Sequence, residues 1–195
     1  MLKINKALLG GSLILLITFN IFNALNFVFQ FSMARMLSVI DYGILATLFS
    51  IIYISGIFSE SIQTIMMKYS SSEKDEGKIK NLMNRSIKKA LKISILLLAV
   101  YLIIAIFLTD ILKISYPLLA LDGIIILSSL FIPINRGIML GKKMFKSLGA
   151  NLILESFGKL IISIVLVFMG WRVYGAIIAT ILAATLAFIF SFKSL

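Results

Sequence analysis

The chain has 195 residues, of which 61% are hydrophobic and 14% charged, and its net charge at pH 7 is +11. Soluble globular proteins are about 45–50% apolar, so this composition indicates a membrane protein. The chain has no Cys and no His, which excludes disulfides, thiolate chemistry, His-ligated metals and His-dependent catalysis. Its eight acidic residues form no recognisable motif, so we expect no enzyme activity, no metal site and no cofactor.

Long apolar runs recur along the whole chain, and each is long enough to cross the hydrocarbon core as a helix. The first run is roughly 25 residues, longer than the roughly 7–15 of a signal peptide, so we expect it to be retained. The fold class is then all-α: a polytopic membrane protein with a bundle of six transmembrane helices. The predicted helices cover residues 7–33, 43–67, 91–108, 117–140, 150–169 and 173–192, within a single membrane domain over residues 1–195.

The connections between these runs carry most of the charge. Residues 35–43 form a polar break, and residues 68–90 predict a basic cytoplasmic loop whose second half has apolar residues at helical spacing. Fifteen of the nineteen Lys and Arg side chains, Lys3 among them, fall on the side of the even-numbered connections and the two termini. By the positive-inside rule both termini are cytoplasmic. The partner of these cations is then an anionic leaflet of membrane lipid and not nucleic acid.

The first predicted helix has an amide-rich face. Asn20, Asn23, Asn26 and Gln30 are three, three and four residues apart, so they share an arc of about 120°. An amide that faces lipid leaves hydrogen-bonding groups unpaired, which is expensive in a membrane. We therefore expect this face to meet other helices or a wet cavity.

The fifth predicted helix carries a second polar face. Asn151, Glu155, Lys159 and Ser163 are each four residues apart, and Glu155 precedes Lys159 in the order that favours an ion pair. A lysine near the centre of a membrane helix costs about 2.5–3.5 kcal/mol, so Lys159 should face protein or water. The alternative is a neutral Glu155–Lys159 pair that only holds helices together.

The second and fourth predicted helices add further polar residues. Asp122 and Arg136 lie on one face of the fourth helix, whose Pro133 predicts a kink, although Arg136 can also snorkel to the interface. Glu60 and Gln63 lie near the inner end of the second helix, where Glu60 can equally be an interfacial carboxylate. We expect helices one, two, four and five to surround a wet space, with three and six as supports. The candidate binding residues are Asn20, Asn23, Asn26, Gln30, Glu60, Gln63, Asp122, Arg136, Glu155 and Lys159.

Three connections carry distinctive motifs. Residues 34–43 are Ala-Arg-Met-Leu-Ser-Val-Ile-Asp-Tyr-Gly, residues 135–145 are Asn-Arg-Gly-Ile-Met-Leu-Gly-Lys-Lys-Met-Phe, and residues 170–176 are Gly-Trp-Arg-Val-Tyr-Gly-Ala. In this order they resemble three connections of the polysaccharide biosynthesis, or oligosaccharide flippase, family, a branch of the multidrug/oligosaccharidyl-lipid/polysaccharide exporters. The first motif is a close match, whereas the second lacks the family's usual Gln before Gly141.

The resemblance implies transport of a polyprenyl-pyrophosphate-linked oligosaccharide across the cell membrane. Amides suit sugar hydroxyls and cations suit phosphates, so Lys159 and Arg136 are expected to attract the pyrophosphate and the Asn20 to Gln30 face to meet the sugar. Family members usually have two six-helix lobes with the cavity between them, and this sequence supplies one. We therefore expect a half-size or truncated flippase that works as a homodimer or with a second-lobe subunit.

Two other functions stay open on the sequence. Six helices in a chain of this length also describe the substrate-binding subunit of a vitamin-type transporter, but these subunits usually carry an Ala-x-x-x-Ala face on the first helix, which residues 7–33 lack. The other is a non-transporting assembly or scaffold protein in the membrane, or an inactive half-gene remnant. Vitamin binding would favour the first, and purification as a monomer without a partner would favour the remnant.

Overall fold

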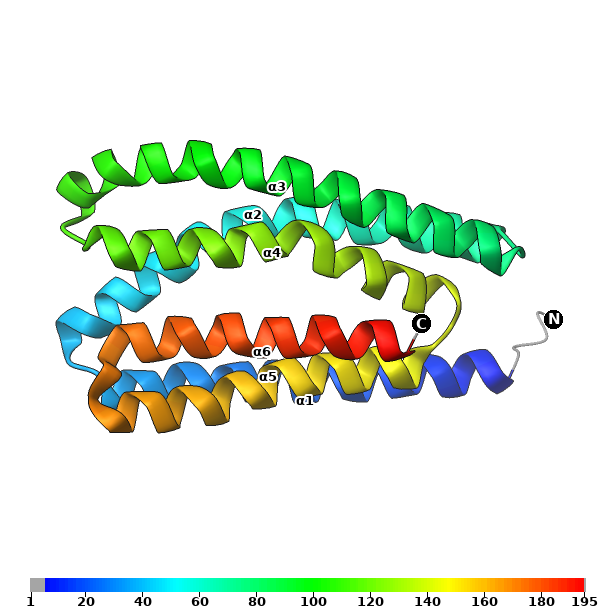
Figure 1. Ribbon diagram of the computed structural model, residues 1–195. Helices are drawn as coiled ribbons and strands as arrows, with labels where there is room; N and C mark the ends of the chain where they lie inside the picture. Colours follow the sequence, from blue (N-terminus) through cyan, green and yellow to red (C-terminus); the bar gives the residue numbers. More distant parts are fainter. Residues whose placement is uncertain (1–5, 195) are drawn as a thin grey trace.

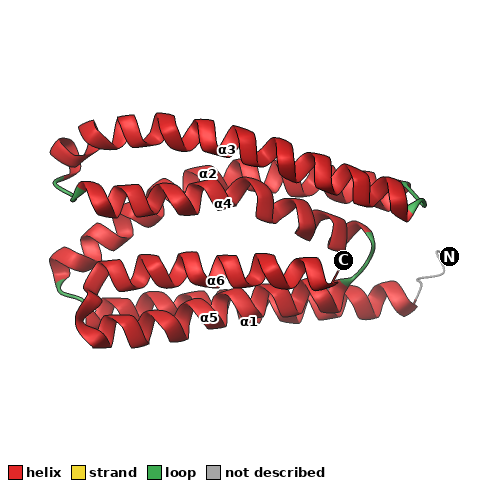
Figure 2. Ribbon diagram, viewed as in Figure 1, coloured by secondary structure: helices red, strands yellow, loops and turns green. Residues whose placement is uncertain are grey.

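The computed structural model describes residues 6–194, which are helical apart from short connections (Figure 2). The all-α class is therefore confirmed. Lys3, one of the cations used for the orientation, lies outside the described residues. The helices are α1 (Lys6–Met36), α2 (Val39–Ser72), α3 (Glu76–Leu112), α4 (Tyr116–Gly141), α5 (Phe145–Leu166) and α6 (Arg172–Ser194), with a π-helical turn, η1 (Val167–Trp171), between α5 and α6.

The described residues contain five helical segments that are long and apolar enough to cross a membrane, and not the six separate spans we expected. The last segment, Phe145–Ser194, comprises α5, η1 and α6 and has 50 residues, about 75 Å at 1.5 Å per residue. It is not straight, because Gly170 has a φ of 90° and Arg172 a φ of 48°, both in the left-handed region. The chain reverses there, and α6 packs along α5 (Figure 1).

The predicted loop over residues 68–90 is wrong, because all but residues 73–75 of it is helical. Asp75 caps α3, its carboxylate accepting hydrogen bonds from the backbone N–H groups of Gly77 at 2.8 Å and Lys78 at 3.2 Å. The helical spacing noted in the second half of this stretch is confirmed. Hydropathy marks where the apolar part of a helix ends, whereas caps and helix propensity decide where the helix itself ends.

The connection between α1 and α2 is also shorter than the predicted polar break over residues 35–43, because only residues 37 and 38 are not helical. The side chain of Ser38 caps α2 by accepting a hydrogen bond from the backbone N–H of Asp41 at 3.1 Å. This segment therefore turns the chain between α1 and α2 within two residues.

The helices form two layers of three (Figure 1). One layer contains α1, α5 and α6, the other contains α2, α3 and α4, and contacts between α4 and α6 join them. The α1–α2 and α3–α4 connections lie at the same end as η1, which we call the η1 end. The α2–α3 and α4–α5 connections lie at the opposite end, which we call the basic end because Lys74, Lys78, Lys142 and Lys143 lie there.

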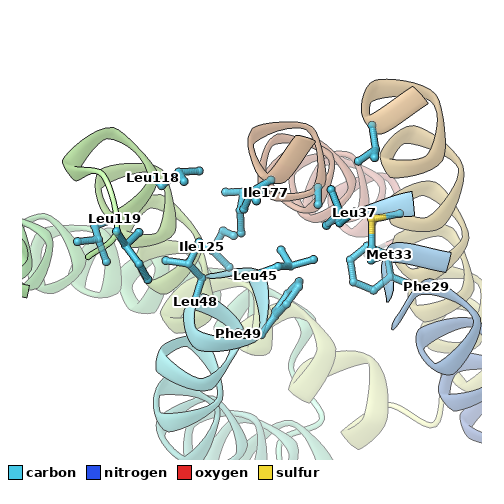
Figure 3. Packing of buried hydrophobic residues seen from close by; sticks show 14 of the residues in the cluster. Phe29, Met33, Leu37, Leu45, Leu48, Phe49, Leu118, Leu119, Ile125 and Ile177 are labelled. Carbon is cyan, nitrogen blue, oxygen red and sulfur yellow. The ribbon is translucent and has the colours of Figure 1, made fainter. Parts of the chain in front are cut away.

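An apolar core fills the space between the two layers at the η1 end (Figure 3). Side chains from the end of α1 meet the start of α2, the first half of α4 and the start of α6. Two smaller clusters lie toward the basic end, one joining α2, α3 and α4 and the other joining α1, α4 and α5. The labelled core residues are Phe29, Met33, Leu37, Leu45, Leu48, Phe49, Leu118, Leu119, Ile125 and Ile177.

A glycine lets α4 approach α2 closely. A methyl group on Gly137 would lie 2.5 Å from the carbonyl oxygen of Gln63 and 2.7 Å from Cβ of Met66. Gly137→Ala should therefore lower the free energy of unfolding by about 1–3 kcal/mol through overpacking. The measurement is the midpoint of unfolding in detergent micelles.

Gly43 offers a matched control on α2, because a methyl group there would have no atom within 4 Å. Gly43→Ala should leave stability unchanged or raise it by up to about 1 kcal/mol, since Ala favours the helix over Gly. Equal behaviour of the two variants would contradict the close contact between α2 and α4.

Candidate functional site

A cavity of about 440 Å³ lies between the two layers, next to the apolar core on its basic-end side. Helices α1, α2, α4 and α5 all contribute to its wall, as expected. Helix α6, expected only as a support, contributes as well, which corrects that expectation. The polar residues of the lining are Asn23, Asn26, Tyr53, Ser55, Ser59, Gln63, Ser128, Ser129, Arg136, Glu155, Lys159 and Thr180.

Pro133 shapes the wall that α4 contributes. A proline has no backbone N–H, so the carbonyl of Ser129, four residues earlier, loses its helical donor. The hydroxyl of Ser59 on α2 donates to this carbonyl at 2.5 Å. A hydrogen bond between helices thus replaces one within the helix, and α4 bends along this stretch (Figure 1).

Arg136 is held by contacts that link α4, α5 and α6. Its Nε donates a hydrogen bond to Oδ1 of Asn151 at 2.8 Å, and its Nη2 forms an ion pair with the Glu155 carboxylate. Asn151 in turn donates from Nδ2 to the carbonyl of Ala187 on α6 at 2.6 Å. The Arg136 and Glu155 side chains are only 14% and 25% exposed, so this pairing offsets their desolvation.

The expected ion pair between Glu155 and Lys159 is wrong, because Arg136 occupies the Glu155 carboxylate. Lys159 instead donates from Nζ to Oδ1 of Asn26, and its Nζ lies 4.6 Å from the ring centroid of Phe29 and 5.8 Å from that of Phe49. No carboxylate forms a salt bridge with Lys159 in the described part of the chain. The cavity lining therefore contains two cations and one carboxylate, which leaves one net positive charge.

Both rings beside Lys159 belong to the apolar core of the η1 end. The ammonium group therefore sits where the cavity meets this core. The candidate list missed Phe29 and Phe49, since an aromatic residue within an apolar helix gives no signal of a polar neighbour. It also missed Asn151, which could have been identified because it lies on the same face of the helix as Glu155.

The structure places four of the ten candidate residues outside the cavity. Asn20 is exposed and donates from Nδ2 to the carbonyl of Leu16 in its own helix at 2.8 Å. Gln30 is half-buried, and Glu60 is exposed on α2. Asp122 is fully buried but faces α3, where its carboxylate accepts a hydrogen bond from the Tyr101 hydroxyl at 3.2 Å.

Polar contacts also tie the two layers together at the η1 end. Arg172, at the start of α6, pairs with Asp41 of α2 at 3.2 Å between Nε and Oδ2. The hydroxyls of Ser115 and Tyr174 lie 3.1 Å apart and link the starts of α4 and α6. Two of the three sequence motifs, which contain Asp41 and Arg172, thus meet at this end.

Comparisons with known proteins agree with this architecture. The profile of a family described as "Polysaccharide biosynthesis protein" matches residues 32–195. No curated protein sequence matches the chain. A solved structure of a multidrug resistance MATE family transporter of the MOP superfamily, in an outward-facing conformation, is similar with a TM-score of 0.69 and 18% sequence identity.

The match to this transporter covers 95% of the present chain and 44% of the transporter's chain. The chain therefore spans less than half the length of the transporter, and at this identity the likeness concerns the fold. Helices long and apolar enough to cross a membrane recur along the chain, as in a multi-pass membrane protein. Because the family match extends over most of its length, the chain belongs to the polysaccharide biosynthesis protein family.

Proposed function

We propose that the chain is one lobe of a flippase that moves a lipid-linked oligosaccharide across the cell membrane, and that it is a transport component and not an enzyme. The observation that carries this proposal is the unneutralised Lys159 in a cavity otherwise rich in amides and hydroxyls. A diphosphate complements the charge, and sugar hydroxyls complement the amides. Family membership supports the same substrate class.

The lining residues divide into two roles in this proposal. Lys159 is the main ligand of the pyrophosphate, because Asn151 and Glu155 already engage Arg136, which adds to the positive potential. Asn23, Asn26 and Gln63 meet the sugar. Asn20, Gln30, Glu60 and Asp122 take no part in binding, since they lie outside the cavity.

We further propose that α5 and α6 each cross the membrane, which gives six crossings with both termini in the cytoplasm. The reversal at Gly170 supports this, because the segment Phe145–Ser194 has 50 residues and, as one straight helix, would be far longer than a bilayer core of about 30 Å. The excess of Lys and Arg at the basic end supports the orientation. The apolar core would then close the cavity toward the outer leaflet.

A second lobe is part of the proposal, supplied by another copy of the chain or by a separate subunit. The chain spans 44% of the similar transporter, and alternating access requires one lobe to move against another. Chemical cross-linking in membranes, followed by purification of the tagged chain, should recover either a dimer or a complex with a second polytopic protein. A chain recovered only as a monomer would contradict the need for a second lobe.

Ligand binding tests the proposed substrate class directly. The purified chain in neutral detergent should bind a polyprenyl-diphosphate oligosaccharide at least about tenfold more tightly than the same glycolipid with an uncharged linkage, because a charge-assisted hydrogen bond contributes about 1.5–3 kcal/mol. Equal affinity for the two lipids would contradict the proposal. Binding of a radiolabelled vitamin in place of either lipid would favour the uptake subunit.

A further inference from the structure

Helix α3 extends well beyond the membrane part of the bundle. It has 37 residues, about 56 Å, whereas a bilayer core is about 30 Å thick. Residues 93–112 contain one charged residue, Asp110, and are about long enough to cross the core alone. Lys92 therefore marks the boundary of the hydrocarbon, and residues 76–92 lie in the headgroup region and beyond it.

The two faces of this part of α3 differ in character. Ile79 and Met83 are buried in a cluster with α2 and α4, and the hydroxyl of Ser94 reaches a backbone carbonyl of α4. Over residues 85–92 the opposite face, which we call the α3 basic face, has four exposed cations within an arc of about 100°. These cations are Arg85, Lys88, Lys89 and Lys92.

The α3 basic face has no carboxylate partner within the described chain. The acidic residues at the basic end are used elsewhere: Glu73 pairs with Lys78 at 3.8 Å, Glu76 pairs with Lys142 at 3.1 Å, and Asp75 caps α3. None of the four cations forms a salt bridge with a described residue. Four positive charges thus lie within about 10 Å along one helix without compensation from the described residues.

We propose that the α3 basic face binds the phosphate headgroups of anionic phospholipids. The depth of the four cations matches the headgroup layer, since they begin at the hydrocarbon boundary and extend about 10 Å from it. The face points away from α2 and α4, and α3 lies at the outside of the bundle (Figure 1). Adjacent cations at spacings of three and four residues can contact one phosphate together.

This proposal goes beyond the transport function and does not depend on it, because none of the four cations lines the cavity. The alternative ligand of the α3 basic face is a soluble protein with an acidic surface. Such a protein would also engage the tip of the α2–α3 hairpin, where Lys74, Lys78 and Lys80 are exposed. The lipid proposal therefore predicts that the tip cations contribute little.

Two triple variants of the full chain with equal charge loss test the proposal. Lys88→Gln/Lys89→Gln/Lys92→Gln removes most of the α3 basic face, and Lys74→Gln/Lys78→Gln/Lys80→Gln removes the tip cations. Native mass spectrometry measures retention of phosphatidylglycerol against phosphatidylcholine in each protein. Each cation near an anionic surface contributes about fivefold, so the first variant should bind phosphatidylglycerol about 100-fold more weakly and the tip variant within about twofold of wild type.

Equal losses in the two variants, or no preference of the wild type for phosphatidylglycerol, would overturn the proposal. If the first triple variant does not fold, the single variants Lys89→Gln and Lys92→Gln should each weaken binding about fivefold. Unchanged binding in both would equally overturn it. Affinity of the cavity for the diphosphate lipid should stay at the wild-type value in the first triple variant, which separates this site from the proposed transport site.

Discussion

Replacing Lys159 by methionine should abolish export of the lipid-linked sugar and leave the folded chain at least as stable as the wild type. Lys159 supplies the net charge of the cavity, and a hydrogen bond from a charged donor contributes about 1.5–3 kcal/mol, or roughly 10- to 150-fold in affinity. Stability should not fall, because an apolar side chain of similar length avoids desolvating a charge. A methionine can also pack against the rings of Phe29 and Phe49.

The measurements are export in cells that depend on this chain and the midpoint of unfolding of the purified protein. Lys80→Met is the matched control, since Lys80 is exposed on α3 and does not line the cavity. Lys159→Arg keeps the charge and should retain part of the export. Normal export by Lys159→Met would remove this residue from the mechanism.

Most of the fold could be predicted from the sequence. The bilayer core offers no hydrogen-bond partners to backbone N–H and C=O groups, so apolar runs of membrane length must form helices. The ends of α2 and α3 could not be predicted from hydropathy, since both helices continue beyond the apolar residues. Their caps at Ser38 and Asp75 depend on local hydrogen bonds that a search for apolar runs ignores. The reversal at Gly170 lies in a connection that was expected, whereas the π-helical turn before it was not expected.

The sequence predicted four of the helices that line the cavity, but the ion pair that it favoured between Glu155 and Lys159 is wrong. Helical spacing identifies neighbours within one helix, so it favoured Glu155 with Lys159. In the folded chain Arg136 comes from α4 and competes for the same carboxylate, with Asn151 accepting from its Nε. A single sequence contains no information on which cation of another helix lies at the right depth.

The two polar residues of α4 show a second limit of helical periodicity. Asp122 and Arg136 share a face only if the helix is straight, but α4 contains Pro133 between them. Asp122 also lies near the η1 end, where the apolar core fills the space between the layers and α3 is its polar neighbour. Two residues on the same face of a helix therefore have similar surroundings only when they are a few turns apart and pack against the same neighbouring helices.

Glu155→Gln should destabilise the bundle by about 3 kcal/mol, the lower end of the range for a broken buried ion pair, because the carboxylate is 25% exposed. The loss arises because Arg136 stays buried without its counter-charge. Glu60→Gln is the matched control: Glu60 is exposed on α2 and should change stability by less than about 0.5 kcal/mol.

The double variant Arg136→Gln/Glu155→Gln separates a broken pair from a general loss of packing. With both charges removed, neither position leaves a buried charge without its counter-charge, so most of the lost stability should return. The measurement is a double-mutant cycle on the free energy of unfolding in micelles, with an expected coupling of about 1–3 kcal/mol. A coupling near zero would mean that Arg136 and Glu155 do not interact across α4 and α5. Lys159 would then no longer be the unpaired cation of the cavity, since that assignment depends on Glu155 being engaged by Arg136.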